Sequence, residues 1–321
     1  MEINQYAPVI ITTLHRYNHF KRCLESLEKC TDADKTEVYV GFDYPPSEKY
    51  KEGWEKIRSY LNEKGNYNHF KKLHIIRRSQ NYGATNNINQ LVKKIREKYS
   101  TYILSEEDNE FSPNFLEYMN KGLEKYKDDN RILRICGYCP PVFKGISNKN
   151  IYCNIDVPAY GTGNWTNKKN QVIRYDQVYD ILKSSFWNTL NLFNTYPALI
   201  YMAVHMAKTK SHSSGDVILS MTNLIKGTCS VCPSRSLVRN WGADGSGLRS
   251  GIVKGLEKEE IQTSNHFSLD DIEIGILPNL KKRLFYRNMP KNKIKFILYY
   301  IYKLLYTLSF YFFYTEKKQK E

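Results

Sequence analysis

Two kinds of hydrophobic pattern alternate over the first 125 residues. Short apolar runs rich in β-branched residues, typical of β-strands, occur at 7–14, 37–42, 72–77 and 102–104. Stretches with apolar residues at helical spacing occur at 17–29, 50–62 and 86–98. Because strand and helix alternate regularly, this part of the chain is predicted to form an α/β fold, with a mostly parallel sheet and helices on both faces.

From about residue 130 the alternation gives way to short strands separated by glycine and proline turns. Helical spacing returns at 177–190 and 216–226, a strand pattern covers 228–238, and a glycine-rich loop follows at 240–251. In parallel α/β sheets, ligands bind beyond the carboxyl ends of the strands. We therefore expect the ligand-binding and catalytic residues of this chain among those that follow the first four strands.

The fourth predicted strand ends in three consecutive carboxylates, Glu106, Glu107 and Asp108. Like charges repel, so such a cluster is expected to hold a cation, together with the diphosphate that the cation carries. On an extended chain Glu106 and Asp108 share a face, and Glu107 points away. Hard oxygen ligands suit Mg²⁺ or Mn²⁺, so the pattern indicates an enzyme that uses a sugar nucleotide.

Four segments resemble the motifs of one enzyme family, in the expected order. They are PVIITTLHRYNHFKRCLESL at 8–27, RSQNYGATNNINQLV at 78–92, LSEEDNEFSPNFLEYM at 104–119 and SLVRNWGADGSG at 236–247. Together they are similar to bacterial glycosyltransferases of the GT-A fold, within or near glycosyltransferase family 2 and the N-acetylglucosaminyltransferase I-like enzymes. The resemblance implies a Rossmann-like central sheet and a nucleotide-sugar donor.

The resemblance also implies a division of the chain. A GT-A catalytic domain is expected over 1–280, with a nucleotide-binding half at 1–125 and an acceptor-binding half at 126–280. Residues 281–321 follow as a basic amphipathic helical extension.

Roles for individual residues follow from the family motifs. Asp108 is expected to bind Mn²⁺ or Mg²⁺, and Asp216 to deprotonate the acceptor hydroxyl, with Asp176 and Asp180 as alternative bases. Trp165 is expected to stack on the acceptor sugar, with core packing as the alternative. The positions expected to bind the nucleotide sugar are Asp43, Arg78, Asn81, Gly83, Asn87, Glu106, Glu107 and Asp244. Arg249 is a further candidate for a phosphate contact.

The function implied is inverting, metal-dependent transfer of a hexose or N-acetylhexosamine from a nucleoside diphosphate sugar. A UDP-sugar is the first donor expected. The acceptor is expected to be a hydroxyl of a glycan or lipid-linked glycan in cell-surface polysaccharide synthesis. A nucleotidyltransferase acting on sugar phosphates would share the acidic metal site, but the chain lacks the N-terminal G-x-G loop and following basic residue of those enzymes. A non-catalytic membrane-binding scaffold would leave the acidic cluster without a role.

Charge is distributed unevenly. The formal net charge is +15, of which residues 281–321 contribute +9, from 11 Lys or Arg and 2 Glu. Basic proteins bind nucleic acid, anionic lipid or phosphorylated substrates, and no nucleic-acid motif supports the first of these. The basicity therefore indicates a partner of the tail, in particular an anionic membrane surface.

The tail itself shows helical spacing of apolar residues from Ile294 to Phe312, with basic residues at both ends. A membrane-spanning helix would place Lys303 near the middle of the bilayer, at a cost of about 2.5–3.5 kcal/mol. An interfacial helix avoids that cost, so residues 291–321 are expected to anchor the protein on the inner face of the cell membrane. Packing on the catalytic domain and dimerisation are the alternatives.

The start of the chain shows no signal peptide pattern, and a cytoplasmic location is expected. Seven cysteines, an odd number, are then expected to be reduced thiols. Two C-x-x-C pairs, at 136–139 and 229–232, fall in strand-like runs where residues i and i+3 face opposite ways. Core positions are therefore favoured over a structural zinc site.

Overall fold

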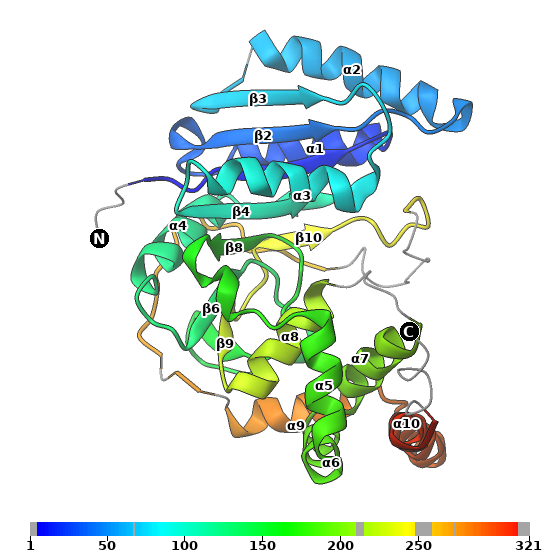
Figure 1. Ribbon diagram of the computed structural model, residues 1–321. Coiled ribbons are helices and arrows are strands. Elements are labelled where there is room, and N and C mark those ends of the chain that lie inside the picture. The colour runs from blue at the N-terminus through cyan, green and yellow to red at the C-terminus, as the bar shows by residue number, and fades with distance from the viewer. Residues whose placement is uncertain are drawn as a thin grey trace.

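The computed structural model describes residues 5–66, 68–209, 215–247, 259–272, 274–275 and 277–313. Within them, eight strands form one sheet in the order β3-β2-β1-β4-β8-β6-β9-β7, and β10 pairs with β5 in a small antiparallel ribbon. Helices cover both faces of the sheet (Figure 1). The predicted α/β fold is confirmed.

The part before residue 126 alternates strand and helix along the chain. Its elements are β1 (Val9–Thr13), α1 (Tyr17–Glu28), η1 (Ala33–Lys35), β2 (Glu37–Phe42), η2 (Glu48–Tyr50), α2 (Lys51–Asn66), β3 (Lys72–Arg77), α3 (Gly83–Arg96), β4 (Thr101–Glu106), β5 (Asn109–Phe111) and α4 (Phe115–Lys125). The strands β3, β2, β1 and β4 are neighbours and all parallel.

The part after residue 126 completes the same sheet and adds a helical layer. Its elements are β6 (Ile132–Cys136), η3 (Pro141–Phe143), β7 (Ile151–Asn154), β8 (Thr162–Trp165), η4 (Asn167–Gln171), α5 (Tyr175–Ser184), α6 (Phe186–Thr195), α7 (Pro197–Thr209), α8 (Gly215–Lys226), β9 (Cys229–Pro233), β10 (Val238–Asn240), α9 (Pro278–Tyr286) and α10 (Lys293–Phe313). Strand β8 lies antiparallel between β4 and β6, and β7 is the antiparallel edge strand beside β9.

The register of the parallel strands brings the carboxyl ends of β1, β2 and β4 to one edge of the sheet. Thr13 in β1 is the partner of Phe42 in β2, and Thr12 is the partner of Glu106 in β4. The residues that follow these strands therefore emerge side by side. This shared edge is the carboxyl edge at which α/β sheets bind ligands.

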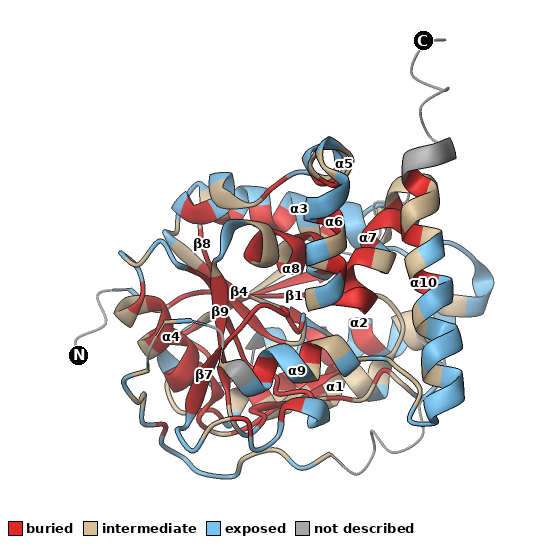
Figure 2. Cartoon of the chain, turned by 90° about the horizontal axis from the view of Figure 1, so that it is seen from below, coloured by how far each residue is buried: buried red, intermediate tan, exposed pale blue. Residues whose placement is uncertain are grey.

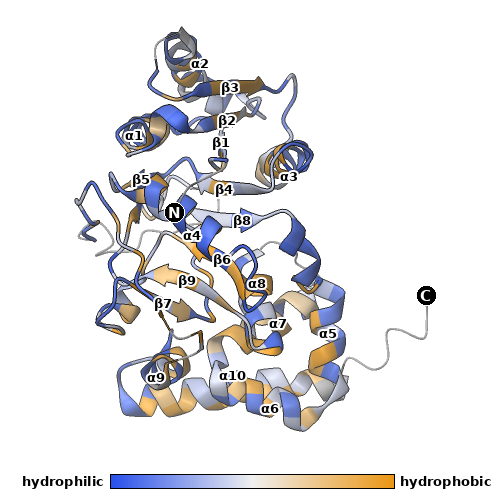
Figure 3. Ribbon diagram, turned by 90° about the vertical axis from the view of Figure 1, so that its left-hand side faces the viewer, coloured by the Kyte–Doolittle hydropathy of each residue, from blue (hydrophilic) through white to orange (hydrophobic). Residues whose placement is uncertain are grey.

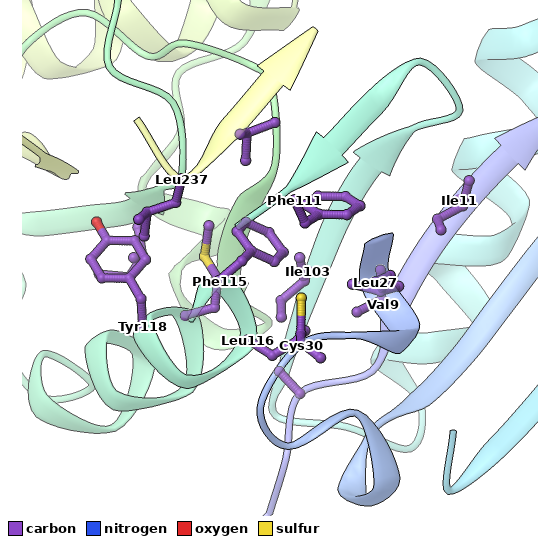
Figure 4. Close-up of a cluster of buried hydrophobic side chains, with 14 of the residues drawn as sticks. Val9, Ile11, Leu27, Cys30, Ile103, Phe111, Phe115, Leu116, Tyr118 and Leu237 are labelled. Carbon is purple, nitrogen blue, oxygen red and sulfur yellow. The ribbon is translucent and has the colours of Figure 1, made fainter. Parts of the chain in front are cut away.

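The main core lies between the sheet and helices α1 and α4. Figure 4 shows its centre, where Phe115 packs among Phe111, Ile103 and Leu237. The residue after β6 and the residue before β8 approach this ring closely, since an added Cβ would lie 2.7 Å from Phe115 at Gly137 and 3.0 Å from it at Gly161. A second core, on the far part of the sheet, is formed mainly by α5 to α8.

Most strand predictions in the first part are confirmed, and the ranges 37–42 and 72–77 agree residue for residue. The single helix predicted at 177–190 is wrong. Ser185 has an extended backbone (φ −151°, ψ 119°) that divides the segment into α5 and α6, and its hydroxyl accepts a hydrogen bond from the Asn188 N–H. The single strand predicted at 228–238 is also wrong, because β9 and β10 join different sheets.

The seven cysteines, all of them described, are buried free thiols. Cys229 lies in the main core and Cys232 in the second core, so this C-x-x-C pair faces opposite sides of the sheet as predicted. The described residues contain no group of three or more His, Cys, Asp or Glu side chains arranged to hold a metal.

Replacing Phe115 by alanine tests the central packing. The fully buried ring packs against the backbone at Gly137 and Gly161, so Phe115→Ala is expected to lower the free energy of unfolding by about 3–5 kcal/mol. Chemical denaturation measures this loss. Phe186→Ala, at a ring that is 36% exposed, is the control, and an equal loss in both variants would contradict the packing assigned to Phe115.

Candidate active site

The acidic segment after β4 forms a turn, and one arginine binds two of its carboxylates. Arg16, between β1 and α1, donates from Nε to Glu107 Oε1 and from Nη2 to Asp108 Oδ2, both at 2.8 Å. Glu107 and Asp108 therefore point to the same cation, and the predicted outward direction of Glu107 is wrong. The extended-strand argument fails because the strand ends at Glu106 and the chain turns at 107–108.

Asp108 is held from a second side by the last residue of β10 and the residue that follows it. Asn240 donates from Nδ2 to Asp108 Oδ1 at 2.7 Å, and the Trp241 N–H donates to the Asp108 carbonyl at 2.8 Å. Asn240 reaches Asp108 because β5 and β10 pair, and this pairing places Asn240 opposite Asn109, the residue after Asp108. Asp108 is only 6% exposed, and both carboxylate oxygens have fixed donors.

Gly242 allows the close approach of this segment to Asp108. A Cβ atom at position 242 would lie 2.1 Å from Asp108 Oδ2. Only glycine fits there without moving the carboxylate. The sequence analysis missed Arg16, Asn240 and Gly242. The position of Arg16, directly after the first strand, was the available signal for its place at the carboxyl edge.

Glu106 and Asp216 form the open part of the acidic site. Burial, together with repulsion from Asp108 and Glu107, raises the pKa of Glu106 to about 7, and the Asp216 carboxylate contributes to the same shift. Burial also raises the pKa of Asp216, at the first turn of α8. Both residues are nevertheless exposed to solvent and do not belong to the core.

Charge at the acidic turn is compensated only in part. Burial lowers the pKa of Arg16, but Glu107 and Asp108 outweigh this effect and raise it. Burial raises the pKa of Glu107, and Arg16 opposes that shift. One guanidinium thus faces three consecutive carboxylates, and the remaining negative charge is directed to the open side at Glu106.

Asp43 and Asn81 lie together, as expected of residues after neighbouring strands. Asp43 Oδ1 accepts the N–H groups of Tyr44 and Tyr82, each at 2.9 Å, and Asn81 Nδ2 donates to the Tyr44 carbonyl at 2.7 Å. Asp43 is 4% exposed. An open cavity of about 460 Å³ begins beside them, lined by Gln80, Asn81, Tyr82, Asn86, Asn89, Gln90 and Lys93.

Arg78 and Asn87 connect β2, β3 and α3. Arg78 donates from Nε to Asn87 Oδ1 at 3.0 Å, and Asn87 donates from Nδ2 to the Gly41 carbonyl at 2.9 Å. Asn87 is 1% exposed, so its amide is used within the protein. Gly83, the first residue of α3, has φ +72° with no atom near an added Cβ, so glycine is required there by the backbone angle alone.

Asp244 lies against α1. Its Oδ2 is 2.9 Å from His19 Nε2, and its Oδ1 accepts the Ser246 hydroxyl at 2.6 Å. Burial would raise the pKa of Asp244, but the bonds from Ser246 and His19 lower it to about 2. The stack of Arg22 and Arg239 on the Trp241 ring, at 4.1 and 3.6 Å, fixes the start of this loop. Arg249 lies outside the described residues.

Trp165 is not brought to the site. The ring is 5% exposed in the main core, its Nε1 donates to the Leu123 carbonyl at 3.0 Å, and the Lys168 ammonium lies 3.8 Å from the ring centre. A ring without an open face has no room for a sugar, so the structure favours the core-packing alternative. Asp176 forms an ion pair with Arg174.

Residues 9–193, more than half of the chain, match the model of the family named glycosyl transferase family 2. The chain belongs to glycosyl transferase family 2. Its GT-A fold agrees with the alternating strands and the mostly parallel sheet described above. No match to a curated protein is found.

The solved structures to which the chain is similar are distant in sequence. S. aureus TarS is similar over 52% of this chain and 30% of that chain, at 14% identity and a TM-score of 0.36. A TarS structure of residues 1–349 is similar over 52% and 50%, at 13% identity and 0.36. The mannosyltransferase PcManGT from Pyrobaculum calidifontis, in complex with GDP-Man and Mn²⁺, is similar over 68% and 69%, at 12% identity and 0.41. The chain thus spans 30% of the full TarS chain, and the family model carries the assignment.

Gly242→Ala is expected to disturb the acidic turn without unfolding the protein. The new Cβ would displace Asp108 Oδ2 from Arg16, so binding of UDP with Mn²⁺, the ligands expected at this turn from the sequence, should weaken at least tenfold, or by about 1.4 kcal/mol. Calorimetric titration of UDP with Mn²⁺ measures the affinity. Gly65→Ala is the control, because its Cβ would meet Ile75 at an ordinary 3.5 Å. Unchanged affinity in Gly242→Ala would contradict this geometry.

Glu106→Gln is expected to change the pH dependence of stability. Because the folded state keeps the Glu106 proton up to a pKa of about 7, ionisation destabilises the fold as pH rises from about 4.5 to 7. The glutamine variant lacks this penalty, so its melting temperature should exceed that of the parent at pH 8 and match it near pH 4. Metal-free thermal melts at both pH values give the comparison, and an equal difference at both would refute it.

Proposed function

We propose that this protein is an inverting, metal-dependent glycosyltransferase that moves a sugar from a nucleoside diphosphate to a hydroxyl of a glycan. The supporting observation is the meeting of Asp108, Glu106 and Asp216 at the carboxyl edge of the sheet. Asp108 is fixed and buried, whereas Glu106 and Asp216 are open to solvent. A donor bound at the acidic turn and an acceptor bound near α8 would therefore meet between them.

The nucleotide is proposed to lie on the side of Asp43 and Asn81. Asp43 Oδ1 accepts two backbone N–H groups, whereas Oδ2 has a long contact of 3.5 Å from Asn81 Nδ2, so Oδ2 is proposed to accept an imide N–H of the base or a ribose hydroxyl. Asn81 and the cavity beside it extend this surface. Arg78 and Asn87 contribute by holding β3 and α3 in place, and Gly83 by opening the turn into α3.

The residues of the acidic turn suit Mn²⁺ or Mg²⁺. Each carboxylate oxygen of Asp108 accepts one hydrogen bond, so lone pairs remain for a hard cation, and Glu106 nearby, whose pKa is about 7, would lose its proton when a cation binds. Asp108 would hold the ion, with donor phosphate oxygens completing its ligands. When bound, the ion neutralises the charge of the departing nucleoside diphosphate. Arg16 keeps Asp108 and Glu107 in position for this.

Asp216 is proposed as the general base. Its carboxylate lies at the open side of the site, and burial raises its pKa toward the operating range of a base. It would accept the proton of the acceptor hydroxyl while that oxygen attacks the anomeric carbon from the side opposite the diphosphate. Direct displacement inverts the configuration. Asp176 is less suited, because Arg174 already binds it.

The finer specificity follows the family resemblance. We propose UDP as the nucleotide, a hexose or N-acetylhexosamine as the sugar, and the N-acetylglucosaminyltransferase I-like enzymes as the nearest subtype. Mn²⁺ and GDP-Man are present in the PcManGT complex, so a guanine nucleotide is the first alternative to test. The acceptor is proposed to be a lipid-linked glycan, reached from the cytoplasm with residues 291–321 on the inner face of the cell membrane.

Donor binding and catalysis should separate in two variants. Asp108→Asn is expected to lose at least tenfold in Mn²⁺-dependent donor affinity, because the amide lacks the charge that holds the cation. A thermal-shift screen of UDP-, GDP-, CMP- and dTDP-sugars, with and without Mn²⁺, identifies the donor and measures the loss. Retained Mn²⁺-dependent binding in Asp108→Asn would remove the metal role from this residue.

Asp216→Asn is expected to keep donor affinity and to lose sugar transfer by about 10²–10⁴-fold, the usual contribution of a general base. Transfer and background hydrolysis of the donor identified in the screen provide the readout. Asp176→Asn is the matched control and should keep the parent rate. A normal transfer rate in Asp216→Asn would assign the base elsewhere.

A further inference from the structure

Helix α10 turns a charged and aromatic row toward the protein and an aliphatic row toward the outside. The buried positions of its described side chains are Lys303, Thr307 and Phe310, at 3, 1 and 0% exposure. Figure 2 shows this division along the helix, with buried residues toward α7 and exposed residues on the other side. An ordinary surface helix has the opposite arrangement.

The inward row fixes the rotation of the helix. The Lys303 ammonium lies 4.4 Å from the Tyr299 ring and 5.3 Å from the Tyr201 ring of α7, and burial lowers the pKa of Lys303. Tyr300 donates to Asn194 of α6 at 2.8 Å. Lys208 of α7 donates to the carbonyl of Tyr306 at 3.0 Å. The opposite side of the helix is exposed, and at its margin the Tyr302 hydroxyl lies 3.4 Å from that of Tyr201.

The outward row is apolar and strongly exposed. It consists of Ile294 at 71%, Ile297 at 55%, Leu298 at 63%, Ile301 at 45%, Tyr302 at 51% and Leu305 at 62%. The same helix is mainly apolar in Figure 3. We name these six residues the outward face. Contiguous exposed apolar surface of this kind marks a binding surface.

The charged side chains of α9, of α10 and of the residues between them are all positive. Residues 278–310 contain no Asp or Glu, and five lysines there are exposed, namely Lys281, Lys282, Lys291, Lys293 and Lys295. A second copy of the chain would bring the same positive charges against these lysines, which opposes self-association. An anionic lipid surface offers both an apolar layer for the outward face and phosphate groups for the lysines.

We propose that α10 lies flat in the headgroup region of an anionic bilayer, with the outward face toward the acyl chains and the lysines on lipid phosphates. The proposal deepens the membrane role proposed for the tail and defines which side of the helix enters the lipid. Lys303 stays on the protein, so no charge is moved into the bilayer. No helix in the described part of the chain is long and apolar enough to cross a membrane.

Vesicle co-sedimentation of the full-length protein tests the outward face. Binding is expected to vesicles of phosphatidylcholine with phosphatidylglycerol, and to fall at least tenfold with phosphatidylcholine alone or in high salt. The double variant Leu298→Asp, Ile301→Asp should lose binding at least tenfold. Tyr44→Asp, at an exposed ring on the nucleotide side of the sheet, should bind like the parent. Equal binding of both variants would overturn the proposal.

Charge and orientation are tested separately. Lys291→Glu with Lys293→Glu should abolish binding, whereas Lys94→Glu with Lys98→Glu, at exposed lysines around the end of α3, should not. Lys303→Leu should bind as the parent does and be released by alkaline carbonate, because the inward row does not enter lipid. Carbonate-resistant Lys303→Leu would indicate a spanning helix and overturn flat docking.

Sedimentation velocity of the lipid-free protein tests the alternative of self-association. If the parent is a dimer and the double variant Leu298→Asp, Ile301→Asp is a monomer, the outward face binds a second copy and the proposal is overturned. Because vesicle binding needs neither donor nor acceptor, its failure leaves the proposed glycosyl transfer untouched. Loss of transfer to a water-soluble acceptor in Asp216→Asn tests that function independently.

Discussion

The site depends on how negative charge is balanced at the turn after β4. Three consecutive carboxylates would repel one another, and the fold compensates two of them with the fork of Arg16 and fixes Asp108 further with Asn240. The compensation is incomplete on one side only. Glu106, whose pKa rises to about 7, faces the open surface together with Asp216, so the remaining demand for positive charge is directed to where a donor would enter.

The two parts of the sheet contribute differently to this arrangement. Parallel pairing of β1, β2 and β4 places Asp43, Arg16 and the acidic turn at one edge. The later segment then approaches from the other side, since β10 pairs with β5 and brings Asn240 and Gly242 against Asp108. The acidic turn thus joins the segment that precedes residue 126 to the segment that follows it. The close backbone approach explains the glycine at position 242.

Helix α10, on the outer surface, also carries a charge whose position is set by packing against the protein. A lysine that would be costly inside a bilayer is placed near one tyrosine ring of α7 and one of α10 itself, and the aliphatic side chains are left outside. The helix therefore contributes to the fold with one side and presents a separate surface with the other. Together with the exposed lysines of α9 and of the residues leading into α10, this surface is distinct from the carboxyl edge of the sheet.

The sequence by itself determined the α/β class, the strands at 37–42 and 72–77, the tail helix and the residues at the strand ends, because periodicity and charge clusters are local properties. It did not determine the direction of Glu107, the break at Ser185 or the burial of Trp165. These depend on a turn, an extended residue and a packed helix that local patterns do not encode. Only the tertiary structure decided that Arg16 and Asn240, separated by more than two hundred residues, meet at Asp108, since long-range strand pairing sets that contact.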